Sequence, residues 1–168
     1  IRHNETVAVY ALGLLNEIKN STEISQALKY EVNEMNTDDL LYLAFLHDLG
    51  KHAVDPVLLN DVNQNEEIHK KITDELRERT VTAISKLGLT RLVPQLEEFY
   101  DFEFNRGRCQ KKSLMTYLVG IVDMYDALTS PKIYHGKSWT ISGTIDEIYR
   151  IPEKEEIFKV AEKIYCPK

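Results

Sequence analysis

Apolar residues recur along most of the chain at intervals of three and four, the spacing that places them on one face of an α-helix. The first such segment contains Val7, Tyr10, Leu14 and Ile18. Further segments with this pattern cover residues 22–33, 66–88, 92–100, 113–130, 141–150 and 152–165. No segment has the alternation of a convincing strand. The pattern therefore predicts an all-α protein, a single-domain bundle of about seven or eight helices.

The most apolar stretch is a run of seven consecutive apolar residues at positions 40–46 (LLYLAFL). A run of this kind predicts an element that is buried on most of its sides. A threonine and two aspartates at 37–39 are typical of a helix N-terminus, where side-chain oxygens and negative charge are favourable. Gly50 stands where such a helix would end. We therefore expect a central helix whose last turn carries His47 and Asp48 out of the apolar core.

Three further polar residues fall on faces that the pattern marks as apolar. His3 lies four residues before Val7 and shares its face. Asp123 and Asp126 are three residues apart within the apolar segment 113–130, and they share a face as well. A buried carboxylate without a partner is costly. Hydrogen bonds within the core would satisfy these groups, and so would a cation bound between them.

Composition narrows the classes of function. The chain has 168 residues, of which 43% are hydrophobic and 29% charged, so it can form one globular domain with a substantial core. Its net charge of −6 argues against nucleic acid as the main partner. The longest apolar run is too short to cross a bilayer, so we expect no membrane partner. Cys109 and Cys166 form no recognisable motif, which favours a cytoplasmic protein. Because the chain begins without Met, we also expect a fragment of a longer protein.

The order H…HD…D, together with two longer stretches, resembles the HD superfamily of metal-dependent phosphohydrolases. Residues 47–60 (HDLGKHAVDPVLLN) are similar to the family stretch HDIGK with its following Val/Ile-Pro segment. Residues 121–139 (IVDMYDALTSPKIYHGKSW) resemble the late motif VDVYDALTS of the HD-GYP subfamily. The resemblance covers nearly the whole chain and implies one HD-type helical bundle over residues 1–168. It implies a metal site at His3, His47, Asp48 and Asp123.

The resemblance also suggests what each residue would do. Two His and two Asp suit one divalent transition metal per chain, Mn, Fe, Ni or Zn, better than Ca. Asp48 and Lys51 would act in catalysis, and Lys51, Lys132 and His135 would contact the substrate. Lys51 is otherwise a cation favoured at a helix end, and the other two belong to an ordinary polar loop. Asp126 suits bracing the helix or a ligand histidine better than binding metal.

The departures from the HD-GYP subfamily are as informative as the matches. Its paired histidines would fall at Leu96 and Glu97, and its Gly-Tyr-Pro triplet is replaced by residues 104–106 (FNR). Its further histidine has no counterpart near positions 74–76, where Glu75 stands. Glu75 and Glu97 could each offer a carboxylate instead, with a reach different from that of imidazole.

Two classes of function follow. One is a metal-dependent phosphohydrolase that acts on a nucleotide or cyclic-dinucleotide phosphodiester. The other is a degenerate HD-GYP-like signalling or regulatory domain that binds metal or ligand without turnover. In either case the partner is a phosphorylated small molecule or a cyclic dinucleotide. The resemblance leaves open a homodimer and an attached sensor or receiver domain.

Overall fold

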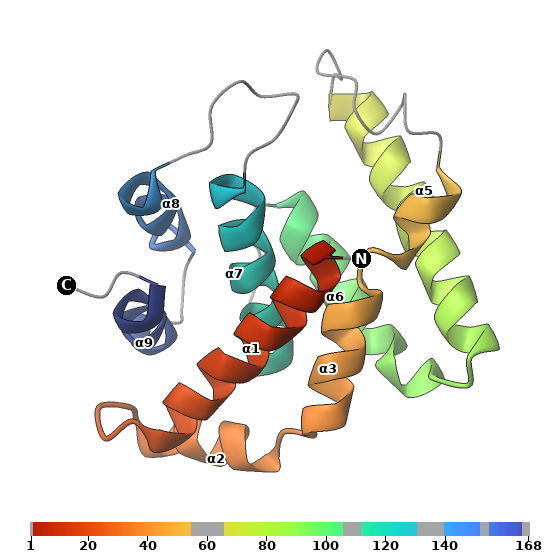
Figure 1. The fold of residues 1–168 in the computed structure, drawn as a ribbon. Coiled ribbons are helices and arrows are strands. Elements are labelled where there is room, and N and C mark those ends of the chain that lie inside the picture. The colour runs from red at the N-terminus through yellow and green to blue at the C-terminus, as the bar shows by residue number, and fades with distance from the viewer. Residues whose placement is uncertain (1, 55–65, 106–111, 131–139, 152–154, 166–168) are drawn as a thin grey trace.

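The structure, a computed structural model, describes residues 2–54, 66–105, 112–130, 140–151 and 155–165. These residues form eight α-helices and two short 3-10 helices without a strand, so the predicted all-α bundle is confirmed. Figure 1 shows their arrangement. The elements are α1 (Arg2–Asn20), α2 (Gln26–Glu34), α3 (Thr37–Leu46), η1 (Leu49–Ala53), α5 (Glu66–Lys86), η2 (Thr90–Leu92), α6 (Val93–Phe104), α7 (Leu114–Thr129), α8 (Ile141–Ile148) and α9 (Glu155–Tyr165).

Side-chain caps fix where several helices begin. Asn36 accepts hydrogen bonds from two backbone N–H groups of α3 and so caps this helix, whereas the sequence suggested the next residue, Thr37. Ser113 and Thr140 cap α7 and α8 in the same way. These caps satisfy N–H groups that helix geometry leaves without a partner. The start of α7, the helix that carries the two aspartates, is therefore well defined.

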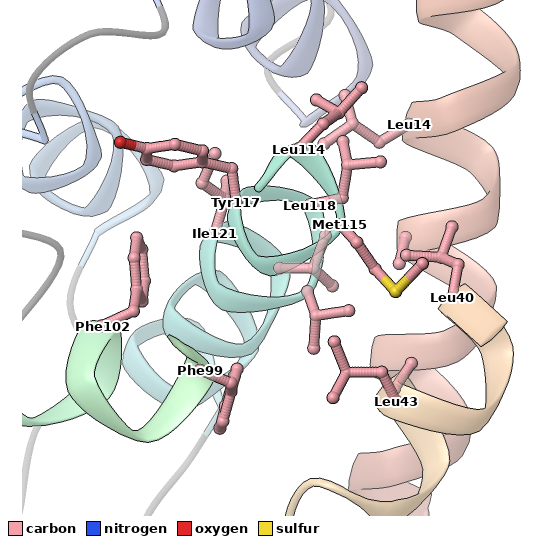
Figure 2. Close-up of a cluster of buried hydrophobic side chains, with 14 of the residues drawn as sticks. Leu14, Leu40, Leu43, Phe99, Phe102, Leu114, Met115, Tyr117, Leu118 and Ile121 are labelled. Carbon is pink, nitrogen blue, oxygen red and sulfur yellow. The ribbon is translucent and has the colours of Figure 1, made fainter. Parts of the chain in front are cut away.

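α7 is the most buried helix of the bundle. Residues 114–122 are all buried, and α7 packs against α1, α6 and α8. Figure 2 shows its side chains between leucines of α1 and α3 on one side and two phenylalanines of α6 on the other. A Cβ atom at Gly120 would lie 2.4 Å from the ring of Phe102, so α6 approaches α7 closely here. This packing holds the following turns of α7, with Asp123 and Asp126, in place.

The apolar run at 40–46 is buried on one face only, which corrects the expectation that most of its sides are covered. Tyr42 is 42% exposed and Phe45 is 43% exposed. The packing partners of α3 are α1 and α7, and they cover only the face made by residues three and four apart. The fully buried residues of the run are Leu40, Leu43 and Ala44.

Gly50 does not end the central helix as the sequence suggested. α3 ends at Leu46, and Gly50 lies inside η1, buried where η1 packs on α5. A Cβ atom at this position would lie 2.4 Å from the carbonyl oxygen of Leu76 and 2.6 Å from Thr80 Oγ1. The close approach of η1 to α5 therefore requires the glycine.

The end of α5 uses a glycine for its backbone conformation instead. Gly88 has a φ of 76° and follows the last turn of α5, where the sequence predicted the helix to stop. The N–H groups of Gly88 and Leu89 bond the carbonyl oxygens of Ser85 and Ile84. This pair of bonds is the Schellman pattern, in which a left-handed residue closes a helix.

The two glycines predict different costs for the same substitution. Gly50→Ala should lower the free energy of unfolding by about 3 kcal/mol, because the added methyl group clashes with a backbone oxygen of α5, and relieving the clash requires the backbone of α5 or η1 to move. Gly88→Ala is the matched control. Its methyl group would meet no atom within 4 Å, and it should cost about 1 kcal/mol for the positive φ. Urea denaturation of both variants beside the wild type measures the difference, and equal losses would contradict the packing argument.

Candidate metal centre

Three helices bring four polar residues to one place. His3 lies in the first turn of α1, His47 and Asp48 lie between α3 and η1, and Asp123 lies in the third turn of α7. α1 packs against both α3 and α7, and its first turn lies beside the end of α3 (Figure 1). The structure therefore brings together the four residues that the sequence singled out as ligands.

The distances within this cluster suit the coordination shell of one ion. His3 Nε2 is 2.9 Å from Asp123 Oδ1 and 3.6 Å from Asp48 Oδ2. His47 Nε2 is 3.6 Å from each of the same two oxygens. The ligand atoms of His3, His47 and Asp48 all lie within 4.8 Å of one another, so these residues could hold a metal ion. Ligand atoms bonded at about 2.1 Å to one ion stand about 3.0 to 3.4 Å apart in octahedral or tetrahedral coordination, close to the separations found.

His47 has the hydrogen-bond pattern of a histidine that could bind a cation. Its side chain is fully buried, and its Nδ1 lies 2.8 Å from the carbonyl oxygen of Ala44. In the neutral imidazole, donation of the Nδ1 proton to this carbonyl leaves Nε2 with a free lone pair, the usual arrangement of a metal-binding histidine. Within the part of the chain that the structure describes, His47 Nε2 has no hydrogen-bond partner. A buried nitrogen in this state is rare unless a ligand uses it.

His3 is held by a second aspartate. Its Nδ1 lies 2.6 Å from Asp126 Oδ2, while its Nε2 is directed to Asp123. Ser130 Oγ donates to the other oxygen of Asp126 at 3.3 Å. A carboxylate on the outer nitrogen of a ligand histidine fixes its tautomer and makes it a stronger ligand. The sequence left open whether Asp126 braces its own helix or a ligand histidine. Its contact with His3 matches the second role.

The histidines and carboxylates shift one another's pKa values. The hydrogen bond with Asp123 raises the pKa of His3 to about 9, against the opposing effect of burial. Burial alone would lower the pKa of His47, but Asp123 and Asp48 together raise it. Burial would raise the pKa of Asp123, yet its contacts with the two histidines hold this pKa well below its usual range. Asp123 therefore stays ionised at neutral pH, and the cluster attracts positive charge.

Lys51 forms an ion pair with Asp48 at the edge of the cluster. Its Nζ donates to the Asp48 carboxylate at 2.6 Å, while its side chain remains 39% exposed. Burial lowers the pKa of Lys51, but the carboxylates of Asp48 and Glu103 raise it above its usual value. Lys51 is thus a charged group at the edge of the site with a defined partner, rather than an isolated cation at a helix end.

A pocket of about 280 Å³ opens beside the cluster. His3, Asp123 and Lys51 contribute to its wall, and so does Glu103 of α6. Burial raises the pKa of Glu103 to about 7, with Lys51 acting in the opposite direction. The pocket therefore contains one carboxyl group that can hold a proton at neutral pH.

Sequence reasoning missed Glu103 because it ended the preceding helix at residue 100 and placed a loop beyond it. α6 continues to Phe104 instead. Glu103 lies four residues after the buried Phe99 and so shares its helix face. The available signal was a carboxylate on the same face as buried apolar residues. It becomes visible only when the predicted helix is continued beyond residue 100.

The other residues that the sequence proposed do not join the cluster. Glu75 pairs with Arg79 at 2.5 Å and Glu97 with Arg77 at 3.4 Å, and both glutamates line a separate pocket between α5 and α6. Leu96 is fully buried in the core. Glu75 and Glu97, whose carboxylates the sequence offered in place of imidazole, are thus held in ion pairs away from the cluster. The two proposed substrate contacts, Lys132 and His135, lie outside the described residues.

Comparison of the sequence with models of known protein families gives no match, and comparison with curated proteins gives none either. The functional argument therefore rests on the site itself. Among the helices that the structure describes, none combines the length and the apolar character needed to span a bilayer.

The raised pKa of Glu103 predicts a pH-dependent stability in the metal-free protein. Between pH 4.5 and about 7, native Glu103 retains a proton that the unfolded chain has released. The residue's contribution to stability is therefore complete below pH 4.5 and is lost as the pH rises through about 7. Gln cannot ionise, so the free energy of unfolding of Glu103→Gln should rise relative to that of the wild type across this interval, by about 3 kcal/mol at its upper end.

Urea denaturation at several pH values, with a chelator present, measures this difference. Glu97→Gln is the matched control, because its carboxylate is 44% exposed and paired with Arg77 on another surface. It should change stability by less than about 0.5 kcal/mol at every pH. Parallel profiles for Glu103→Gln and the wild type would show that Glu103 ionises as an ordinary surface carboxylate does.

Proposed function

We propose that the chain is a metal-dependent phosphohydrolase domain related to the HD superfamily, closest to a degenerate HD-GYP domain. Its substrate would be a nucleotide or cyclic-dinucleotide phosphodiester. The observation that carries the proposal is the buried Nε2 of His47, which has no hydrogen-bond partner among the described residues. It lies 3.6 Å from one oxygen of Asp48 and one of Asp123. An apolar core seldom places such an atom beside two carboxylates unless a cation binds there.

Four residues would hold the ion: His3, His47, Asp48 and Asp123. Two imidazoles and two carboxylates suit Mn, Fe, Ni or Zn. When bound, such an ion polarises a phosphoryl oxygen and lowers the pKa of a bound water to around neutrality. We expect about one ion per chain, because Glu75 and Glu97 pair with arginines at a different pocket.

Other side chains of the site have roles that follow from their positions. Lys51 lies at the edge of the pocket, where its ammonium group can donate to a phosphate oxygen. Asp126 keeps Nδ1 of His3 occupied, so that Nε2 is directed to the ion. Glu103 can hold a proton near neutral pH beside the position that a phosphoester would take. These groups bind, orient and exchange protons, as hydrolysis of a phosphodiester requires.

A regulatory module without turnover is the second candidate. It is favoured by a specific observation, namely that the chain's own cations already compensate the carboxylates of the site. Lys51 is bonded to Asp48, and His3 to Asp123 and Asp126. A site balanced in this way could bind an anionic ligand without hydrolysing it. The loss of the subfamily's paired histidines points the same way.

The metal ligands predict a selective loss of binding. Asp123→Ala should abolish binding of Mn²⁺, measured by isothermal titration calorimetry, because it removes the carboxylate that contacts both histidines. Asp146→Ala is the matched control, since Asp146 is exposed on α8, and it should leave the affinity unchanged. Far-UV circular dichroism should show both variants to be helical. Undiminished Mn²⁺ binding by a folded Asp123→Ala variant would exclude this site.

The missing histidines predict restricted activity. Elemental analysis should find about one metal ion per chain. With added Mn²⁺, hydrolysis of cyclic-di-GMP should be weak or absent, because a second ion is missing that would stabilise the leaving oxygen. A simple activated phosphodiester should still be cleaved, because its leaving group departs without that help. Two or three ions per chain with rapid cyclic-di-GMP turnover would contradict the degeneracy. A fully loaded protein that cleaves neither substrate would favour the regulatory module.

A further inference from the structure

The turn that carries His47 and Asp48 is held at both ends by side chains from other helices. Tyr100 Oη of α6 donates to the carbonyl oxygen of His47 at 2.8 Å. The N–H of Gly50 donates to Thr80 Oγ1 of α5, also at 2.8 Å. Thr80 Oγ1 and Tyr100 Oη are themselves 2.8 Å apart. Both side chains are buried, so water does not compete for these bonds.

Counting protons fixes the direction of the two outer bonds. Each hydroxyl group has one proton, and Tyr100 donates its proton to His47. Thr80 Oγ1 also lies 2.9 Å from the carbonyl oxygen of Leu76, which has two lone pairs and can accept from this hydroxyl group as well as from a backbone N–H. The Thr80 proton is therefore shared between two acceptors, Leu76 O and Tyr100 Oη. When it lies toward Tyr100, the bonds run one way, from the Gly50 N–H through Thr80 and Tyr100 to the His47 carbonyl. In both cases the Gly50 N–H donates to Thr80 and Tyr100 donates to His47.

This chain of bonds replaces a bond that the backbone would otherwise make. Gly50 and His47 are three residues apart, and in a continuous 3-10 turn the Gly50 N–H would bond the His47 carbonyl directly. Two hydroxyl groups from α5 and α6 are inserted between them. The next N–H, that of Lys51, bonds the carbonyl of Asp48 at 2.9 Å. The break between α3 and η1, which directs His47 and Asp48 to the same point, is thus built around Thr80 and Tyr100.

α6 also contacts the imidazole of His47. The ring of Phe99 lies edge-on to it with centroids 4.9 Å apart. Neighbouring residues of α6 therefore fix the side chain and the backbone carbonyl of one metal ligand. Thr80 and Tyr100 are absent from the wall of the site pocket, so any influence they have on a ligand must pass through the turn.

We propose that Thr80 and Tyr100 are positioning residues for the metal site, and that their hydroxyl pair sets the geometry of the turn that presents His47 and Asp48. As far as metal is concerned, this inference rests on the proposed function. Phe and Val would fill the same space, but they would leave the Gly50 N–H and the His47 carbonyl buried without partners. The turn would then move to satisfy them, and the two ligand atoms would separate.

The test compares Tyr100→Phe, Thr80→Val, the double variant and the conservative Thr80→Ser with the wild type, using Mn²⁺ alone as the probe. Tyr100→Phe and Thr80→Val should each weaken Mn²⁺ affinity about tenfold or more. The double variant should lose little beyond either single variant, because both interrupt one chain of bonds. Thr80→Ser, which keeps the hydroxyl group, should restore affinity to nearly the wild-type value.

Two controls separate positioning from general destabilisation. Tyr149→Phe removes a tyrosine hydroxyl that bonds Glu162, between α8 and α9, and should not change Mn²⁺ affinity. Ile148→Val trims a buried residue of α8 and lowers stability without touching the turn. If Tyr100→Phe and Thr80→Val bind Mn²⁺ as tightly as Ile148→Val does, the positioning role is overturned.

A metal-free measurement distinguishes failure of this inference from failure of the proposed function. Hydrogen exchange of the Gly50 amide, followed by NMR with a chelator present, should be faster in Tyr100→Phe and Thr80→Val than in Ile148→Val. Unchanged protection would overturn the chain of bonds. If the wild type binds no Mn²⁺ while the Gly50 amide behaves as expected, the metal proposal is overturned and the structural role of the pair stands.

Discussion

Compensation of charge inside an apolar bundle is the constraint on which this structure depends. Asp123 follows directly after the buried stretch of α7, and its carboxylate lies where an unpaired ion would cost several kcal/mol. α1 supplies His3 and the end of α3 supplies His47, while Lys51 balances Asp48. No one of these helices can neutralise the cluster alone. The placement of α1 against α3 and α7 therefore satisfies polar groups as well as apolar surface.

Different helices supply the polar atoms of the cluster and the residues that support them. α1, α3 and α7 contribute the polar atoms, and the buried half of α7 anchors their common packing. α5 and α6 contribute support from behind, through Thr80, Tyr100 and Phe99. α6 also reaches the pocket directly, since its last turn carries Glu103. A shift of α6 would consequently move the backbone of His47, its imidazole ring and the pocket wall together.

Much of this arrangement could be predicted from the sequence, for a definite reason. The spacing of apolar residues predicts the helices. A His or Asp inside such a pattern is conspicuous, because an unpaired polar group is rarely buried. His3, His47, Asp48 and Asp123 stand out on that ground, while their convergence on one site was implied by the resemblance to the HD superfamily. The exposure of Tyr42 and Phe45 could not be predicted, because an apolar run does not show on which side its neighbours pack.

The supporting residues were hidden for a related reason. Thr80 and Tyr100 are ordinary residues of amphipathic helices, and nothing local marks a hydroxyl group whose partner belongs to another element. Gly50 likewise looked like a helix stop, since the backbone of α5 that excludes a side chain there is remote in the sequence. Local patterns identified groups that need a partner in the core, while the groups that hold the turn depend on how the helices come together.

The contact between His3 and Asp126 spans 123 positions of the chain. Closing a loop of this length costs chain entropy, which the packing of α1 on α7 must offset. A partly folded intermediate containing α1 to α3 would already have His3, His47 and Asp48, but it would lack both aspartates of α7. The complete set of four residues can therefore exist only where α1, α3 and α7 are packed together, which makes the cluster a marker of this three-helix contact.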